Sequence, residues 1–363
     1  MADPVITAII PTFRRPRLLK RAIESVLAQS YRHVKVCVHD NASGDETEEV
    51  VAQYARRDDR VVYLKNGENI GAANNFVKGV EAVTTDFYSL LSDDDFLLPG
   101  FYEQAIAAFE KHPQAGFVCV KTITVDVMNK RMCFRNRDWR PGLHQPSNDV
   151  TTLMYNSHFT QTGVLLRTHM RESIGPFEKS GDDRLYLVMA SAASPFVVLD
   201  MYGAVFSIHS QAYSVTTGLR QGDVPAAYEA LLSTVSTVIQ LPIPTDRKVH
   251  LLLLILRSYI QTFDAQQLEQ LRKGVRREDE STTISLRSYA TTAGLLAHFY
   301  ETTPRRLRPL LTCCLAVFRH LRKRRRSRAK GNWSALPEDT CRFLLQEDSD
   351  VSRFLASIQE TGG

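Results

Sequence analysis

Three adjacent carboxylates, Asp93, Asp94 and Asp95, follow an apolar stretch of the chain. Like charges at this spacing repel one another and destabilise a fold unless a cation lies beside them. A hard divalent cation, held by one or two carboxylates and completed by water and substrate phosphates, is the usual partner. The alternative interpretation is a solvated turn that caps a helix beginning near Pro99.

The apolar periodicity of the first 120 residues predicts the elements that position these carboxylates. Short apolar runs typical of buried strands alternate with the 3–4 residue spacing of helices. The predicted strands are 5–10, 34–39, 61–64, 87–91 and 117–120, and the predicted helices are 15–30, 45–55, 71–83 and 101–111. Ser43, with Glu46 three residues later, predicts the N-cap of the second helix. This alternation predicts a mostly parallel sheet with helices on both faces.

Two other predicted strands also end in polar side chains. Thr12 follows the first strand and Asp40 follows the second. Ligands of open α/β sheets bind beyond the carboxyl ends of the strands, so these residues and the three aspartates are expected to share one site. The sequence contains neither GxxxxGK[ST] nor a GxGxxG after the first strand, which argues against a P-loop NTPase and a dinucleotide-dependent oxidoreductase. A diphosphate would then be held mainly through the cation.

The remainder of the chain has a different pattern. Strands are predicted at 163–167 and 196–206, a helix at 183–193 and a long loop at 131–145. From Pro225 onward only helices are predicted, at 226–240, 250–270, 285–299 and 309–325. A glycine-containing stretch, 218–225, is the expected boundary between the two parts.

The net charge of +5 conceals a local basic cluster. Residues 305–330 contain eleven Lys and Arg and no Asp or Glu, so the remainder of the chain has a net charge of −6. Apolar residues precede this run, a pattern typical of an interfacial helix on an anionic membrane. The alternatives are a solvated helix face that packs on the acidic body, and nucleic-acid binding, for which Trp333 is the single nearby stacking aromatic outside the apolar stretch.

Cysteine usage and hydropathy indicate the compartment. Six cysteines without a CxxC pair are typical of reduced thiols in an intracellular protein. The first residues lack the features of a signal peptide, and no apolar run approaches 18 residues. We therefore expect a cytoplasmic protein whose basic segment makes a peripheral contact with the inner face of the cytoplasmic membrane.

Four segments, taken in order, resemble successive blocks of the family 2 glycosyltransferases, which have the GT-A fold. They are VITAIIPTFRRPRLLKRAIESVLAQSY, VCVHDNASGDET, NGENIGAANNFVKGV and YSLLSDDDFLLPGF. The resemblance is strong over about residues 4–120 and weak over about 160–215. It implies a Rossmann-like, mostly parallel α/β sheet with a helical C-terminal region. We divide the chain into a nucleotide-sugar-binding half (1–120), an acceptor-binding half (121–222), a helical region (223–304) and a basic, membrane-associating segment (305–363).

The resemblance also implies which residues bind the donor. Asp40 matches the acid that binds the base, commonly uracil or thymine, and Asp94 matches the metal ligand of the DxD motif. The motif departs from the family because Ser92 replaces its usual first aspartate. His209 matches a histidine that contacts the metal or diphosphate. The expected nucleotide-sugar contacts are Pro11, Thr12, Arg14, Asp40, Asn69, Gly71, Asp93 and Asp95. For Asp95 a structural role is the alternative.

An acidic pair, Asp182 and Asp183, matches the family's acceptor site. The resemblance implies that Asp183 is the catalytic base and that Asp182 contacts the acceptor. The alternative is that both are favourable charges at a helix N-terminus. Arg220 is a candidate phosphate ligand. Trp139 and His158 are candidates for stacking on the acceptor, although a core position is the ordinary role of such residues.

These residues imply a metal-dependent inverting glycosyltransferase with Mn²⁺ or Mg²⁺ as cofactor. Its donor would be a nucleoside-diphosphate sugar, with UDP or dTDP favoured. Its acceptor would be a glycan in the synthesis of cell-surface polysaccharide or lipid-linked oligosaccharide, and no nucleic-acid partner is expected. Two alternatives stay open. A non-catalytic glycan- or membrane-binding protein on the same fold is suggested by Ser92. A sugar nucleotidyltransferase is disfavoured because no glycine-rich loop follows the first strand.

Overall fold

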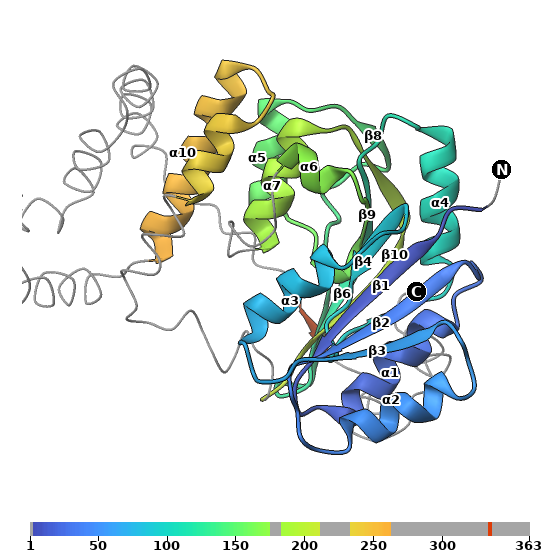
Figure 1. Cartoon of the computed structure of the whole chain (residues 1–363). Helices are drawn as coiled ribbons and strands as arrows, with labels where there is room; N and C mark the ends of the chain where they lie inside the picture. The colour runs from blue at the N-terminus through green and yellow to red at the C-terminus, as the bar shows by residue number, and fades with distance from the viewer. Residues whose placement is uncertain (1–2, 175–182, 211–232, 263–332, 336–363) are drawn as a thin grey trace, which may run out of the picture.

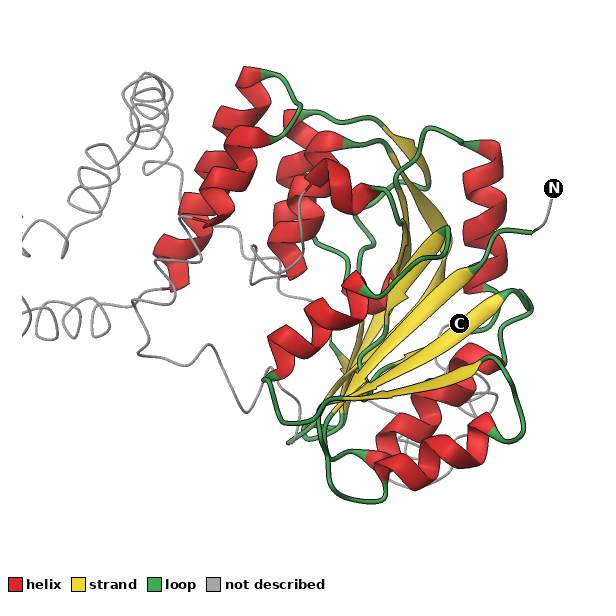
Figure 2. Cartoon of the chain, in the orientation of Figure 1, coloured by secondary structure: helices red, strands yellow, loops and turns green. Residues whose placement is uncertain are grey.

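The computed structural model describes residues 3–174, 183–210, 233–262 and 333–335 (Figure 1). These residues form one mixed sheet with helices on both of its faces (Figure 2). The predicted α/β class and its helical covering are therefore confirmed.

The strands pair in the order β11-β7-β6-β9-β4-β1-β2-β3, and β10 pairs with β5, β6 and β8. Their bounds are β1 (Ile6–Thr12), β2 (Val34–Asp40), β3 (Val61–Lys65), β4 (Phe87–Leu90), β5 (Phe96–Leu97), β6 (Phe117–Asp126), β7 (Arg131–Phe134), β8 (Gly142–His144), β9 (Val164–Arg167), β10 (Phe196–Ile208) and β11 (Ser334–Ala335). The pairs β1–β2, β2–β3, β1–β4 and β6–β10 are parallel, whereas β9 is antiparallel to both β4 and β6. Because β9 opposes both neighbours, β4 and β6 run in the same direction. Strands β1, β2, β4, β6 and β10 therefore all end at one edge of the sheet, which we call the carboxyl edge.

Two groups of helices cover the sheet. Within the described residues, the helices are α1 (Pro16–Leu27), α2 (Thr47–Ala55), α3 (Ala72–Glu81), α4 (Phe101–Lys111), α5 (Asn148–Asn156), α6 (Met170–Ile174), α7 (Asp183–Ala193) and α10 (Thr245–Thr262), with a 3-10 turn η1 (Gln161–Gly163) before β9. Helices α1, α2 and α4 lie on one face, whereas α3, α5, α6, α7 and α10 lie on the other (Figure 1). Residues 233–240 are also helical.

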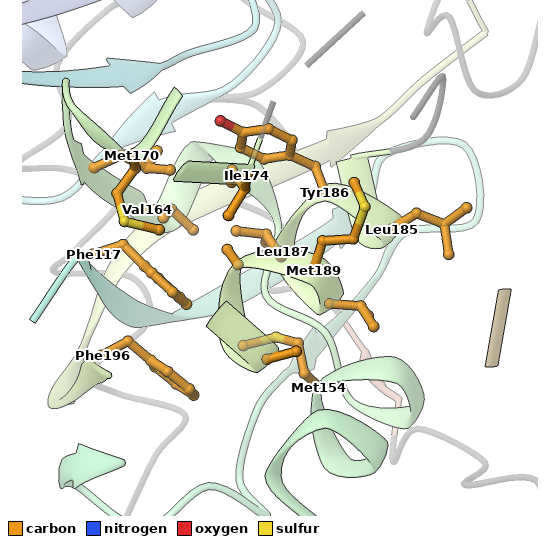
Figure 3. Packing of buried hydrophobic residues seen from close by; sticks show 14 of the residues in the cluster. Phe117, Met154, Val164, Met170, Ile174, Leu185, Tyr186, Leu187, Met189 and Phe196 are labelled. Carbon is orange, nitrogen blue, oxygen red and sulfur yellow. The ribbon is translucent and has the colours of Figure 1, made fainter. Parts of the chain in front are cut away.

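Alternation along the central strands divides the core between these two faces. Ile9 packs beneath α3, whereas Ala8 and Ile10 pack toward α1. Such strands read as continuous apolar runs because both of their faces are buried. On the α3 face, the rings of Phe117 and Phe196 stack with centroids 4.6 Å apart, next to side chains from α5, α6 and α7 (Figure 3).

The structure corrects three predictions of local structure. Residues 131–145 are not one long loop, since β7 and β8 lie within them and pair with β6 and β10. Ser43 is not the N-cap of α2; Glu46 precedes that helix, and the Ser43 hydroxyl instead donates to Asp40. Strand β6 extends to Asp126, so the predicted strand 117–120 ends too early.

The C-terminal predictions are described in part. Helix α10 begins at Thr245 and contacts α5 and α7, close to the predicted helix 250–270. The predicted helices at 285–299 and 309–325, and the basic segment 305–330, lie outside the described residues. Among the helices of the described part, none has the length and apolarity needed to cross a bilayer.

Candidate active site

The carboxyl edge brings three strand ends together. Thr12, the last residue of β1, pairs in register with Asp40, the last residue of β2. The acidic run, Asp93, Asp94 and Asp95, follows β4, which pairs with β1 on the side opposite β2. The Thr12 hydroxyl donates a 2.7 Å hydrogen bond to Oδ2 of Asp93. The sheet therefore assembles the polar residues that the strand order predicted to be neighbours.

Arg15 contacts two of the three aspartates. Its Nη1 lies 3.0 Å from Oδ1 of Asp93 and 3.0 Å from Oδ2 of Asp94. Pro16 occupies the first turn of α1, which places Arg15 at the N-terminal end of that helix. Burial and the neighbouring Asp94 carboxylate raise the pKa of Asp93, whereas Arg15 and Thr12 oppose that increase. A protein cation therefore partly neutralises the acidic run.

Asp94 and His209 face each other across the site. Nε2 of His209, just beyond β10, lies 3.1 Å from Oδ2 of Asp94. Mg²⁺ binds its ligands at about 2.0–2.1 Å in octahedral geometry, so two adjacent ligands lie about 3.0 Å apart. The two atoms are hydrogen-bonded to each other here, and their spacing would also suit two adjacent ligands of such a cation.

The donor set at this point is small. Among the described residues, no group of three or more His, Cys, Asp or Glu side chains is placed to hold a metal. Asp94 and His209 would therefore supply two ligands, and phosphate oxygens and water would supply the others, as is usual for Mg²⁺ at phosphate sites.

Asp95 differs from its two neighbours because it joins distant parts of the backbone. It is fully buried and accepts hydrogen bonds from the Thr162 hydroxyl at 2.5 Å and from the backbone N–H of Ser207 at 2.9 Å. Burial, followed by the Asp94 charge, raises its pKa well above the usual value. These contacts tie the acidic run to η1 and β10, so the geometry gives Asp95 a structural task.

A second arginine, Arg21, lies beneath the acidic run. Its Nη2 donates to the backbone carbonyl of Asp94 at 2.8 Å, and its guanidinium lies 4.7 Å from the centre of the Phe96 ring. Burial lowers the pKa of Arg21 to about 10, although Asp95 and Asp94 oppose that shift. Arg21 therefore stays charged at neutral pH and holds the backbone of the acidic run.

At the end of β2, the side chain of Asp40 is held on both of its oxygens. Oδ1 accepts from the backbone N–H and the hydroxyl of Ser43, and Oδ2 accepts from the Tyr63 hydroxyl at 2.6 Å. The carboxylate is 1% exposed. Its role in binding a base stays a prediction.

An asparagine network fixes the loop between β3 and α3. Asn41 donates to Oδ1 of Asn69 at 2.7 Å and accepts from the backbone N–H of Ile70 at 3.0 Å. The same Oδ1 of Asn69 accepts from the backbone N–H of Gly71. Gly71 has a φ of +85°, which favours glycine, and it begins α3. The two predicted contacts Asn69 and Gly71 are thus anchored to the end of β2.

Two further predicted contacts lie at the end of β1. Pro11 is buried within the sheet, opposite His39. Arg14 is exposed, and its Nε donates to the backbone carbonyl of Ser43 rather than to the aspartates. Arg15, which sequence reasoning missed, makes the acidic contacts instead.

The acceptor-side predictions are described less completely. Asp183 is the first residue of α7, whereas Asp182 and Arg220 lie outside the described residues. The suggestion that Trp139 stacks on an acceptor is wrong: the side chain is 1% exposed, packs against Phe196 and donates to the carbonyl of Ser157. The suggested role of His158 stays a prediction.

Three other residues of the site lacked a clear sequence signal. Arg21 lies on the buried face of α1, and a charge on an apolar face was the one hint that it needed a partner. Thr162 and Ser207 reach Asp95 across 67 and 112 residues of sequence, so local patterns do not reveal them.

Comparisons with known proteins identify the family of this domain and its fold. The family model for glycosyl transferase family 2 matches residues 7–174. A Campylobacter jejuni GalNAc(5)-diNAcBac-PP-undecaprenol beta-1,3-glucosyltransferase is 36% identical over 98 residues, which are 27% of this chain and 32% of the relative. The putative glycosyltransferase EpsE of Bacillus subtilis is 31% identical over 112 residues, 31% of this chain and 40% of that protein. The chain thus spans about a third of the length of the curated relatives it matches.

Solved structures resemble the fold over a longer range. S. aureus TarS 1–349, in complex with UDP-GlcNAc, aligns with a TM-score of 0.57 at 15% identity, covering 98% of this chain and 92% of TarS 1–349. At that identity the likeness concerns the fold alone. Taken together, the comparisons show that residues 7–174 carry a family 2 glycosyltransferase domain and that the fold is GT-A-like.

Proposed function

We propose that this protein is an inverting glycosyltransferase that moves a sugar from a nucleoside-diphosphate sugar to a glycan acceptor with the aid of Mn²⁺ or Mg²⁺. The observation that carries the proposal is the pairing of Asp94 with His209 beside the buried Asp93 at the carboxyl edge. These groups lie within and next to a family 2 domain.

Each residue has a definite task in such a reaction. Asp94 and His209 would hold the divalent cation, which would stabilise the charge of the leaving diphosphate. Asp183 would take the proton of the acceptor hydroxyl. The acceptor oxygen then forms a bond to the anomeric carbon on the face opposite the diphosphate. The bond from that carbon to the phosphate oxygen breaks, and its electron pair leaves with the diphosphate.

UDP or dTDP is the nucleotide we favour. Asp40 occupies the position that the family resemblance assigns to recognition of the base, and Asn41 fixes the loop beside it. The similar S. aureus protein has been crystallised with UDP-GlcNAc, so UDP-sugars come first in any donor panel.

A glycan is the acceptor class we propose, and a lipid-linked glycan is the form to test first. The name of the Campylobacter jejuni relative describes an undecaprenol-linked acceptor. We also propose that residues 305–330, with their eleven basic side chains, contact an anionic leaflet. Sedimentation with anionic and with neutral vesicles tests that contact, and equal binding to the two would refute it.

The first experiment is a thermal-shift panel of UDP, dTDP, GDP and CMP, each with and without Mn²⁺. A ligand at 100 times its Kd stabilises the folded state by about 2.7 kcal/mol, which gives a readable change in Tm. We expect one diphosphate to stabilise the protein in a Mn²⁺-dependent way. Asp94→Asn should abolish that dependence, whereas Asp200→Asn, on an exposed carboxylate of β10, should preserve it.

Turnover separates the remaining alternatives. If wild type releases UDP from a UDP-sugar and Asp183→Asn does not, the result supports sugar transfer. Nucleotide binding without release from any donor would favour the non-catalytic binding protein. Failure of every nucleotide to bind would refute the proposed function.

A further inference from the structure

One guanidinium bridges the two carboxylates nearest the proposed cation. A single nitrogen, Nη1 of Arg15, lies 3.0 Å from Oδ1 of Asp93 and 3.0 Å from Oδ2 of Asp94. That Asp94 oxygen is the same atom that His209 faces at 3.1 Å. The guanidinium and a divalent cation would therefore use the same carboxylate oxygen.

The acidic run can carry its charge only with cationic help. Asp93, Asp94 and Asp95 are 4%, 7% and 0% exposed, and Arg21 reaches only the backbone carbonyl of Asp94. Removing a partner from a buried ion pair is strongly unfavourable because it leaves an uncompensated charge. Arg21 adds its charge from beneath the run, and Arg15 is the arginine in direct contact with the carboxylates of Asp93 and Asp94.

The position of Arg15 also allows it to serve a second anion. It precedes α1 directly, and its side chain is 18% exposed, against 6% for Asp93. Arginine binds phosphate through a planar fork of N–H donors as readily as it binds carboxylate. A diphosphate that arrives beside Asp94 would offer the guanidinium a new partner.

We propose that Arg15 is a positioning residue that couples cation binding to nucleotide binding. Its guanidinium opposes the binding of a divalent cation at Asp94 until it binds a diphosphate instead. This inference rests on the proposed function. Before the donor arrives, Arg15 weakens the cation site. Once the diphosphate is bound, the contact of Arg15 with Asp94 is exchanged for a contact with phosphate, and the carboxylate oxygen becomes available. By thermodynamic reciprocity, Mn²⁺ then strengthens UDP binding by the same factor by which UDP strengthens Mn²⁺ binding.

The test is calorimetric titration of the full chain with Mn²⁺ alone, with UDP alone and with each in the presence of the other. Arg15→Gln and Arg15→Met remove the charge, and Arg15→Lys retains it. Arg56→Gln is the matched control because it removes the same charge from an exposed arginine just after α2, which is not among the proposed contacts. Circular dichroism establishes that each variant is folded.

We expect Mn²⁺ alone to bind the two neutral Arg15 variants about tenfold more tightly than wild type, within the usual range of coupling factors. We also expect the mutual strengthening of Mn²⁺ and UDP to fall in those variants. Arg15→Lys and Arg56→Gln should remain near wild type.

Opposite results would overturn the inference. If Arg15 instead held Asp94 in place for the metal, the neutral variants would bind Mn²⁺ more weakly than wild type. Equal Mn²⁺ affinities in all variants, or an equal gain in Arg56→Gln, would show that Arg15 does not specifically oppose the cation. If wild type binds UDP and Mn²⁺ but the Arg15 substitutions change neither affinity, this inference alone is refuted. If wild type binds no nucleotide, the proposed function is refuted.

Discussion

Replacement of Asp95 with alanine tests whether this carboxylate holds the site together. The change removes the acceptor of the Thr162 hydroxyl and of the Ser207 backbone N–H, and both donors are buried. A hydrogen bond to a charged group contributes about 1.5–3 kcal/mol. Loss of two such bonds is offset in part, because burial disfavours the charged form of Asp95 and raises its pKa. We therefore expect Asp95→Ala to lower the free energy of unfolding by about 3 kcal/mol.

Asparagine at the same position separates the hydrogen bonds from the charge. Its carbonyl can accept from Ser207, and its amide can donate to the Thr162 hydroxyl, so only the charge beside Arg21 is lost. The loss of stability in Asp95→Asn should therefore be smaller than in Asp95→Ala. Urea unfolding at pH 7, followed by circular dichroism, measures both, with Asp200→Ala as the exposed control.

Two results would refute this reasoning. An Asp95→Ala variant within about 1 kcal/mol of wild type would mean that the two buried donors find other partners. An Asp95→Asn variant of normal stability but much weaker UDP affinity would assign Asp95 to the donor rather than to the fold, as the family resemblance implied.

Three further outcomes follow from the packing and the charges. Gly79→Ala should lower the free energy of unfolding by about 1–3 kcal/mol despite alanine's better helix propensity, because its Cβ would lie 2.6 Å from Cγ2 of Ile9; urea unfolding measures this. Burial lowers the pKa of His250, so the folded state favours the neutral ring. The contribution of this ring to the free energy of unfolding is complete above about pH 6.5 and declines as the pH falls toward the folded-state pKa. His250→Gln should therefore reduce the loss of Tm on acidification. Asn41→Ala should lower the free energy of unfolding by about 2 kcal/mol and weaken UDP binding, because it removes the acceptor for the N–H of Ile70; calorimetry and urea unfolding measure both effects.

Local pattern was sufficient for most of the elements of the first 120 residues. Helix 101–111 was predicted with its observed bounds, and the strands differed from prediction by one or two residues, apart from the longer β6. A buried parallel strand carries a continuous apolar run, and a helix between such strands carries a 3–4 repeat, so both are visible in sequence. The same rule placed Thr12, Asp40 and the acidic run at one edge of the sheet.

The short antiparallel strands were less visible. Strands β5, β7 and β8 have two to four residues each, too few for a period to be recognised. Strands β5 and β8 pair with β10, which is distant in sequence, whereas β7 pairs with the preceding strand β6. Ser43 was misassigned for a related reason. Its hydroxyl could either cap the helix N-terminus or donate to Asp40, and a hydrogen bond to a carboxylate is the stronger of the two.

The sequence by itself therefore determined the fold class, the order of the first strands and helices, and the meeting of three polar strand ends, since these depend on periodicity and on the geometry of parallel sheets. Only the tertiary structure decided what each aspartate of the acidic run contacts. Asp93 and Asp94 share Arg15, Asp94 faces His209, and Asp95 turns inward to Thr162. Three identical side chains in a row have the same local propensity, and their different tasks arise because the partners come from β10, η1 and the N-terminal end of α1, which only folding brings together.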